Sequence, residues 1–233
     1  MSPDLARRVV AEALGTGFLV AAVIGSGIAS TRLSPDDVGL QLLENSLVTG
    51  AALVALILAL QPVSASFNPV VTLVERAWGL VGTREATALV AAQVVGACAG
   101  AVVANLMFGL DAVSTASTTR ATGGHGLGEV VATFGLVVVI FGSLRSGRVD
   151  TVAFAVGGYI TAAYWFSSST SFANPAVTVA RTLSDTFAGI APSSVPVFVG
   201  AQLVGGALAF GAVGYLFPHP RLDPSVDPQE VSP

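Results

Sequence analysis

Six long apolar stretches, separated by short polar segments, make up most of the chain. They occupy residues 9–29, 40–60, 86–108, 127–144, 151–166 and 195–217. Because about 20 helical residues cross the hydrocarbon core of a bilayer, each stretch is close to the length of one membrane span. The pattern predicts an all-α integral membrane protein that crosses the bilayer six times.

A short motif occurs once in each half of the chain. It reads Ser66-Phe67-Asn68-Pro69-Val70-Val71-Thr72 in the first half and Ser171-Phe172-Ala173-Asn174-Pro175-Ala176-Val177-Thr178 in the second. Asn is a favoured helix N-cap and Pro is favoured at the first helical position, so each Asn-Pro pair predicts a helix start. Both helices are too short to cross a bilayer. Two such half-helices in corresponding halves of a membrane protein indicate a permeation site between them.

Other features also recur in the same order in the two halves. Glu12 is followed four residues later by a Thr, as is Glu129, and an Ala-Gln pair ends at Gln93 and again at Gln202. The repeats cover about residues 6–108 and 124–217. Each unit has three spans, an odd number, so the second unit is inverted in the membrane. We expect one channel domain over residues 1–217 and a disordered tail over 218–233.

The composition excludes a soluble domain and a nucleic-acid partner. The chain is 53% hydrophobic and only 10% charged, against roughly 25% charged residues in soluble domains. Its mean hydropathy is +0.77. The net charge is −4 and all ten basic residues are Arg, which leaves no basic patch for nucleic acid.

The distribution of arginines predicts the orientation, because short cytoplasmic loops carry an excess of positive charge. A six-span topology places seven of them on one side, Arg7, Arg8, Arg76, Arg84, Arg145, Arg148 and Arg221, and three on the other, Arg32, Arg120 and Arg181. Both termini are therefore expected to be cytoplasmic.

The two repeats resemble the aquaporin, or major intrinsic protein, family. The resemblance is carried by the doubled Asn-Pro motif, the inverted repeat and the Ala11-Glu12 and Gly15-Thr16 pairs, and it covers about residues 9–217. It implies a right-handed bundle of six tilted helices and two re-entrant half-helices. It also implies a homotetramer with one pore in each protomer, in a bacterial-type inner membrane.

The resemblance and the physics of helix ends agree on the pore motifs, Asn68, Pro69 and Val70 with Asn174, Pro175 and Ala176. Each half-helix N-terminus carries a partial positive charge that opposes cations, and each Asn amide has NH2 donors for a solute oxygen. Glu12 and Glu129 are costly in hydrocarbon, so they are expected to face the bundle interior. In the family the matching acids brace the loops that carry the motifs; a proton relay is the alternative.

The narrow outer filter departs from the family pattern. The third residue after the second Asn is usually Arg, and here it is Val177, with Arg181 one helical turn farther along. By resemblance the other filter positions are Thr49, Ala162 and Ser171. Such a set has no large aromatic, no His and no fixed cation, so we expect a wide filter. It resembles the filter of bacterial members associated with arsenic resistance, which implies glycerol, urea, un-ionised arsenite or antimonite, and water as solutes.

Two other functions are alternatives to a channel. Inverted repeats with broken helices also build ion-coupled secondary transporters, for which Glu12 and Glu129 are the candidate ion ligands. An intramembrane enzyme lacks a motif: there is no HExxH, no GxSxG and no Cys/His cluster. We therefore expect no catalytic residue, metal or cofactor. His125, in a Gly-rich segment expected to be a loop, is a minor candidate for a pH gate.

Overall fold

The computed structural model describes residues 2–218, and this part of the chain is helical, with no β-strand. The helices are α1 (Pro3–Leu33), α2 (Val38–Leu60), α3 (Pro69–Ala77), α4 (Thr83–Met107), α5 (Gly123–Arg145), α6 (Val152–Phe166), α7 (Pro175–Ala180) and α8 (Val195–Leu216). Short 3-10 turns flank them at Val149–Thr151, Arg181–Leu183 and Pro192–Ser194. The predicted all-α class is confirmed. The predicted disordered tail lies outside the described residues from position 219 onward, as does Arg221.

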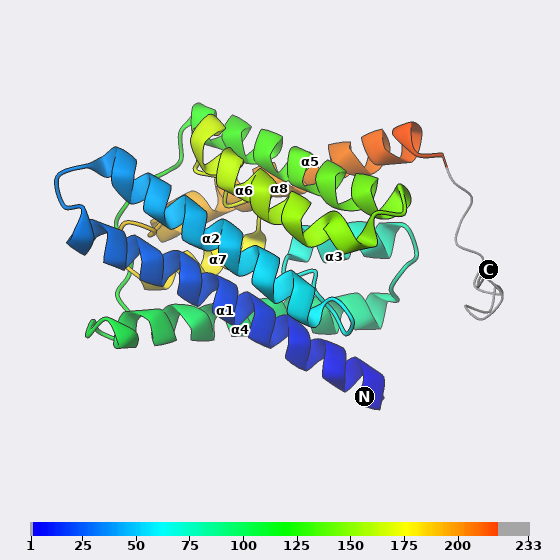
Figure 1. Ribbon diagram of the computed structural model, residues 1–233, viewed down its shortest axis with the longest axis horizontal. Helices are drawn as coiled ribbons and strands as arrows, with labels where there is room; N and C mark the ends of the chain where they lie inside the picture. Colours follow the sequence, from blue (N-terminus) through cyan, green and yellow to red (C-terminus); the bar gives the residue numbers. More distant parts are fainter. Residues whose placement is uncertain (1, 219–233) are drawn as a thin grey trace.

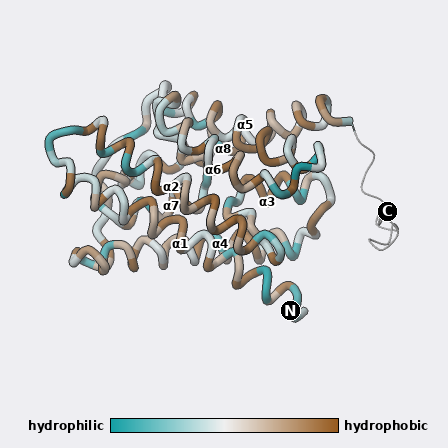
Figure 2. The backbone as a smooth tube through the Cα atoms, in the orientation of Figure 1, coloured by the Kyte–Doolittle hydropathy of each residue, from teal (hydrophilic) through white to brown (hydrophobic). Residues whose placement is uncertain are grey.

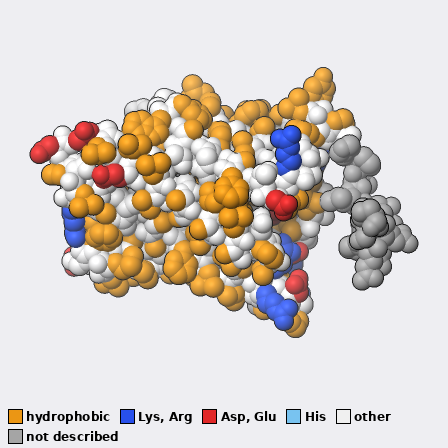
Figure 3. All heavy atoms as spheres, in the orientation of Figure 1, with side chains coloured by type: hydrophobic (Ala, Val, Ile, Leu, Met, Phe, Trp, Pro, Cys, Tyr) orange, Lys and Arg blue, Asp and Glu red, His pale blue; other side chains and the backbone are white. Residues whose placement is uncertain are grey.

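Each predicted span corresponds to one helix. Among the described residues, five helices are long and apolar enough to cross a membrane. The sixth, α6, has 15 residues and is about 22 Å long at 1.5 Å per residue. Hydrophobic residues run along the helices, and the hydrophilic ones collect at their ends (Figure 2). In the space-filling view the charged side chains likewise gather toward the two ends, with an apolar band between them (Figure 3).

The helices pair in the way that a duplicated unit requires. α1 packs along α4 in the first half, and α5 packs along α8 in the second, while α2 and α6 contact each other between the halves. The two half-helices lie inside this bundle: α3 contacts α4 and α8, and α7 contacts α4 and α8 as well. Figure 1 shows α3 toward the end of the molecule that carries the N-terminus and α7 toward the opposite end. We call these the inner end and the outer end.

Glycines on α4 bring this helix very close to α1. A Cβ added at Gly96 would lie 2.1 Å from the carbonyl oxygen of Ala13, and one added at Gly100 would lie 2.1 Å from that of Gly17. Neither position accepts a side chain. Small residues allow the backbones of membrane helices to approach closely, which is how these helices pack without a hydrophobic force between them.

Val70, which stands where the second motif has the smaller Ala176, is accommodated by a glycine on α8. Val70 is 2% exposed, and a Cβ added at Gly206 would lie only 2.3 Å from its Cγ1 atom. The extra methyl groups therefore fill space between α3 and α8. α3 packs on α8 through this contact. The Val70 side chain therefore requires that position 206 has no side chain.

This contact predicts a compensating pair of substitutions. Gly206→Ala should destabilise the protein by about 1–3 kcal/mol, because overpacking forces neighbouring groups to shift, and Val70→Ala introduced into that variant should restore much of the loss. The measurement is unfolding of the detergent-solubilised protein by SDS. Gly211→Ala, where an added Cβ meets nothing within 4 Å, is the matched control. Equal stability of the two single glycine variants would contradict the proposed contact.

Candidate functional site

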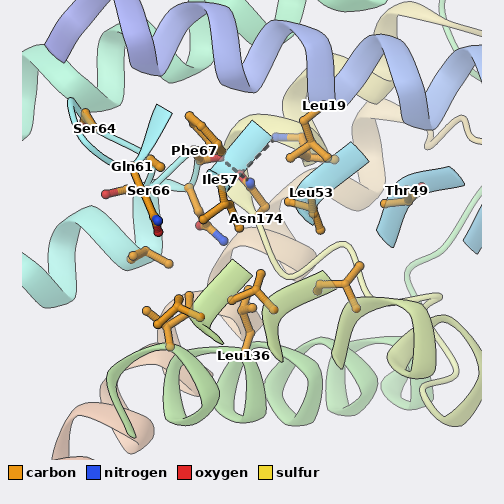
Figure 4. Close-up of a pocket in the computed structure, with 18 of the residues that line it drawn as sticks. Leu19, Thr49, Leu53, Ile57, Gln61, Ser64, Ser66, Phe67, Leu136 and Asn174 are labelled. Atoms are coloured by element: carbon orange, nitrogen blue, oxygen red, sulfur yellow. Dashed lines mark hydrogen bonds between the residues drawn. The ribbon is translucent and has the colours of Figure 1, made fainter. Parts of the chain in front are cut away.

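A cavity of about 520 Å³ runs through the bundle between the half-helices. Its wall includes both motif asparagines, Asn68 and Asn174, and we call it the passage. Figure 4 follows it from Gln61, Ser64 and Ser66 past Phe67 and Asn174 to Thr49. The apolar part of its wall comes mainly from α1, α2, α5 and α6, with Leu19, Val23, Leu53, Ile57, Leu136, Ile140, Val152, Val156 and Ile160.

The two half-helices meet tip to tip and are joined by their asparagines. The Nδ2 atom of Asn68 donates to the carbonyl oxygen of Ala173 at 2.7 Å, and the Nδ2 atom of Asn174 donates to the carbonyl oxygen of Phe67 at 2.7 Å. Each Oδ1 atom accepts from the first turn of its own half-helix, from Val70 in one case and from Ala176 and Val177 in the other. The asparagines are thus both helix caps and cross-links, and each amide has one N–H left for a solute.

The residue before each Asn has an unusual backbone. Phe67 has φ 49° and Ala173 has φ 48°, in the left-handed region that costs a non-glycine residue about 1–3 kcal/mol unless its surroundings hold it there. A buried carboxylate does so in each half. Glu12 accepts hydrogen bonds from the backbone N–H groups of Ser66 and Phe67, at 2.8 and 2.7 Å. Glu129 accepts from Phe172 and Ala173, at 2.8 Å each.

A glutamine links each of these carboxylates to a half-helix. The Nε2 atom of Gln93 donates to Glu12 and to Thr72 of α3, at 2.7 and 2.9 Å. The equivalent Gln202 donates to Glu129 and to Thr178 of α7. Both acids are completely buried, and neither lines the passage. The sequence repeat contains these glutamines without indicating their role, which the geometry assigns as part of the brace.

The brace predicts a structural effect of removing its charge. Glu129→Gln places an NH2 donor against a backbone N–H, so we expect a loss of about 1.5–3 kcal/mol of stability, the range for hydrogen bonds to charged groups. SDS unfolding in detergent measures it, with the exposed Asp36→Asn as the control. If Glu129 were instead a proton relay, the substitution would change the response of flux to a pH gradient and leave stability unaltered.

Polar groups gather in the outer part of the passage. Thr49 of α2 and Tyr164 of α6 both line it, and their hydroxyl oxygens lie 3.1 Å apart. Ser171 also lines it: the side chain is 3% exposed, and its Oγ atom has no hydrogen-bond partner among the described residues. A buried hydroxyl without a partner is costly, so this atom is placed to bond a polar solute. Val177 lies in the same wall.

The structure places Tyr164, and not the predicted Ala162, in the wall of the passage. Ala162 is exposed on the outer surface of the helix and does not line the passage, whereas Tyr164 does. The lining residues of α6 recur every four positions, Val152, Val156, Ile160 and Tyr164, as one face of a helix requires. A large aromatic therefore contributes to the outer wall, contrary to the expectation of small residues only.

Arg181 also corrects the expected absence of a fixed cation. Its side chain is 3% exposed and lines the passage beside Val177. The Nε atom donates to the carbonyl oxygen of Ala188, and the guanidinium lies over the ring of Phe172, 3.4 Å from its centroid. The sequence signal for this role is the position of Arg181 one turn beyond Val177. In the structure the long Arg181 side chain reaches the wall of the passage.

The remaining candidates do not join the passage. His125 lies in the first turn of α5 rather than in a loop, with its Nδ1 atom 2.9 Å from Thr122 Oγ1, and it does not line the cavity. Within the described residues, no group of three His, Cys, Asp or Glu side chains is arranged to hold a metal ion.

Comparisons with known proteins agree with this geometry. A sequence profile of the family described as Major intrinsic protein matches residues 1–151. The chain is 50% identical over 214 residues to Aquaglyceroporin AqpS of Rhizobium meliloti (strain 1021), an alignment covering 91% of each chain. Among solved structures, the aquaglyceroporin from Plasmodium falciparum superposes with a TM-score of 0.70, covering 92% of this chain and 98% of that one. At 19% identity, that match shows the fold alone.

Proposed function

The chain belongs to the major intrinsic protein family, and we propose that it is a passive channel that conducts small uncharged polar solutes, glycerol among them, along the passage. The observation that carries this proposal is the passage itself, about 520 Å³ in volume, with Asn68 and Asn174 in one continuous wall. Family membership makes the protein a channel rather than an enzyme.

The chemistry of the wall favours polyols and neutral hydroxides. The wall combines aliphatic side chains with the Asn68 and Asn174 amides and the hydroxyls of Thr49 and Ser171. A molecule with several hydroxyl groups and a small apolar face, such as glycerol, can contact both kinds of group at once. We extend the proposal to urea, to water and to un-ionised arsenite and antimonite, since the last two present three hydroxyls each and carry no charge.

An ion-coupled carrier needs ligands for its coupling ion, and the candidate acids are not free to serve. Glu12 is fully buried and accepts hydrogen bonds from Ser64, Ser66, Phe67 and Gln93. Glu129 is similarly occupied, by Phe172, Ala173 and Gln202. Because neither lines the passage, neither meets a solute or ion moving through it.

The test is stopped-flow light scattering of proteoliposomes after an osmotic step with glycerol. We expect flux that rises in proportion to the gradient without saturating and that is indifferent to pH and sodium gradients. Empty liposomes are the control for lipid permeation. Saturating flux that requires an ion gradient would instead support a carrier, and flux no faster than that of empty liposomes would reject the channel.

Val177 is the position at which width can be tested directly. Val177→Arg adds a second long cation one turn from Arg181, and we expect roughly a tenfold lower flux of glycerol and arsenite, or about 1.4 kcal/mol of added barrier. Val177→Met supplies similar length without charge and separates the two effects. Unchanged flux of both solutes in the Arg variant would show that Val177 does not belong to the filter.

The proposal includes the membrane and the orientation of the chain in it. We propose a bacterial-type inner membrane with both termini in the cytoplasm, supported by Arg8, Arg76 and Arg145 at the inner end. There Arg8 pairs with Glu85, and Arg145 bonds to Phe217 and lies over Trp78. The homotetramer remains a proposal that rests on the family.

A further inference from the structure

Two charged residues occupy equivalent positions in the inverted repeat. Glu75 follows Asn68 by seven residues, and Arg181 follows Asn174 by seven residues. Both line the passage. Because the two half-helices enter from opposite ends, one position carries a carboxylate at the inner end and the other a guanidinium at the outer end.

The contacts of Glu75 leave its carboxylate without an ion pair within residues 2–218. The carboxylate accepts a hydrogen bond from the Oγ atom of Ser66 at 3.1 Å. Arg8 lines the same part of the passage, but its charge is already paired with Glu85. Glu75 also lies in the last turn of α3, where the helix dipole disfavours an acid. The acid is therefore not explained by helix stability.

The surroundings of Arg181 add a second cation close to the outer part of the passage wall. Arg120 also lies near the ring of Phe172, 5.6 Å from its centroid, and donates to the carbonyl oxygens of Gly189 and Phe187. Both arginines line a second pocket of about 200 Å³ at this end. Within residues 2–218, the ion pair formed by Arg8 is the single one, so neither Arg120 nor Arg181 forms an ion pair with a carboxylate there.

We propose that Arg181 and Glu75 are barriers of opposite sign at the two ends of the passage, which together restrict it to uncharged solutes. This inference rests on the proposed channel function. The half-helix N-termini and Arg181 oppose cations, but the same charges attract anions. Glu75 supplies the opposing charge, so an ion of either sign meets one repulsive end while a neutral solute meets none.

The inner barrier is expected to depend on pH. Burial raises the pKa of Glu75 to about 7, Ser66 lowers it through a hydrogen bond, and the charges of Glu12 and Arg8 act in opposite directions. A carboxylate is charged above its pKa, so Glu75 should repel anions strongly at pH 8 and weakly at pH 6.

The experiment measures ion leak and glycerol flux in the same proteoliposomes. Potassium leak is followed with an ion-selective electrode in the presence of a protonophore, and chloride leak in the presence of valinomycin. The variants are Arg181→Met, Arg181→Gln and Glu75→Gln, with Arg181→Lys as the charge-preserving variant. The exposed Arg32→Met and Asp150→Asn are the matched controls.

We expect no ion leak from the unsubstituted channel at pH 8 and none from the controls. Arg181→Met and Arg181→Gln should raise potassium leak about tenfold, the effect of one monovalent charge a few ångströms away in a wet site, whereas Arg181→Lys should not. Glu75→Gln should raise chloride leak similarly at pH 8, with a smaller difference from the unsubstituted channel at pH 6.

Variants that conduct glycerol yet leak no more ions than the unsubstituted channel would overturn the inference. Should both neutral Arg181 variants fail to fold, the chloride arm of Glu75→Gln decides alone. Absence of glycerol flux through the unsubstituted channel is a different result, because it rejects the proposed function and not the charge arrangement.

Discussion

The structure depends on satisfying irregular backbone in the middle of a membrane. Hydrocarbon offers no partner to a free N–H or carbonyl group, so a chain that dips in and turns back must be bonded by protein or line a wet cavity. Glu12 meets this requirement by accepting hydrogen bonds from the N–H groups of Ser66 and Phe67. Glu129 does the same for Phe172 and Ala173. The asparagines then use the carbonyls of Phe67 and Ala173 to join the half-helices.

Duplication supplies the same parts twice, and the differences between copies are where each half becomes specific. Cap, brace and linking glutamine recur in both halves with closely matching hydrogen bonds. Val70 and Ala176 differ in size, and Gly206 makes room for the larger Val70, which does not line the passage. Glu75 and Arg181 differ in charge, so equivalent positions of the two halves place opposite charges in the passage wall, while the central frame stays symmetric.

Local patterns predicted the frame well. The Asn-Pro pairs cap helices where expected, and six apolar stretches correspond to six helices. The outer wall was harder because it depends on helix phase and on side-chain reach. Ala162 and Tyr164 lie in the same apolar stretch of the sequence. Only the four-residue recurrence of the α6 lining residues shows that Tyr164, and not Ala162, faces the passage. The sequence places Arg181 one turn beyond position 177, about 5.4 Å along a helix, and does not show that its side chain spans this distance.

Width and charge are therefore set by different residues in this outer wall. An Arg at position 177 would narrow the passage and charge it at one level, whereas Val177 leaves that level apolar and Arg181 holds the guanidinium against Phe172, anchored to Ala188. Anchoring keeps the charge in the wall rather than across the passage. In the proposed channel an uncharged solute meets the apolar Val177 at this level, while a cation meets the fixed charge of Arg181. Passage of neutral solutes and rejection of ions are compatible in one passage for this reason.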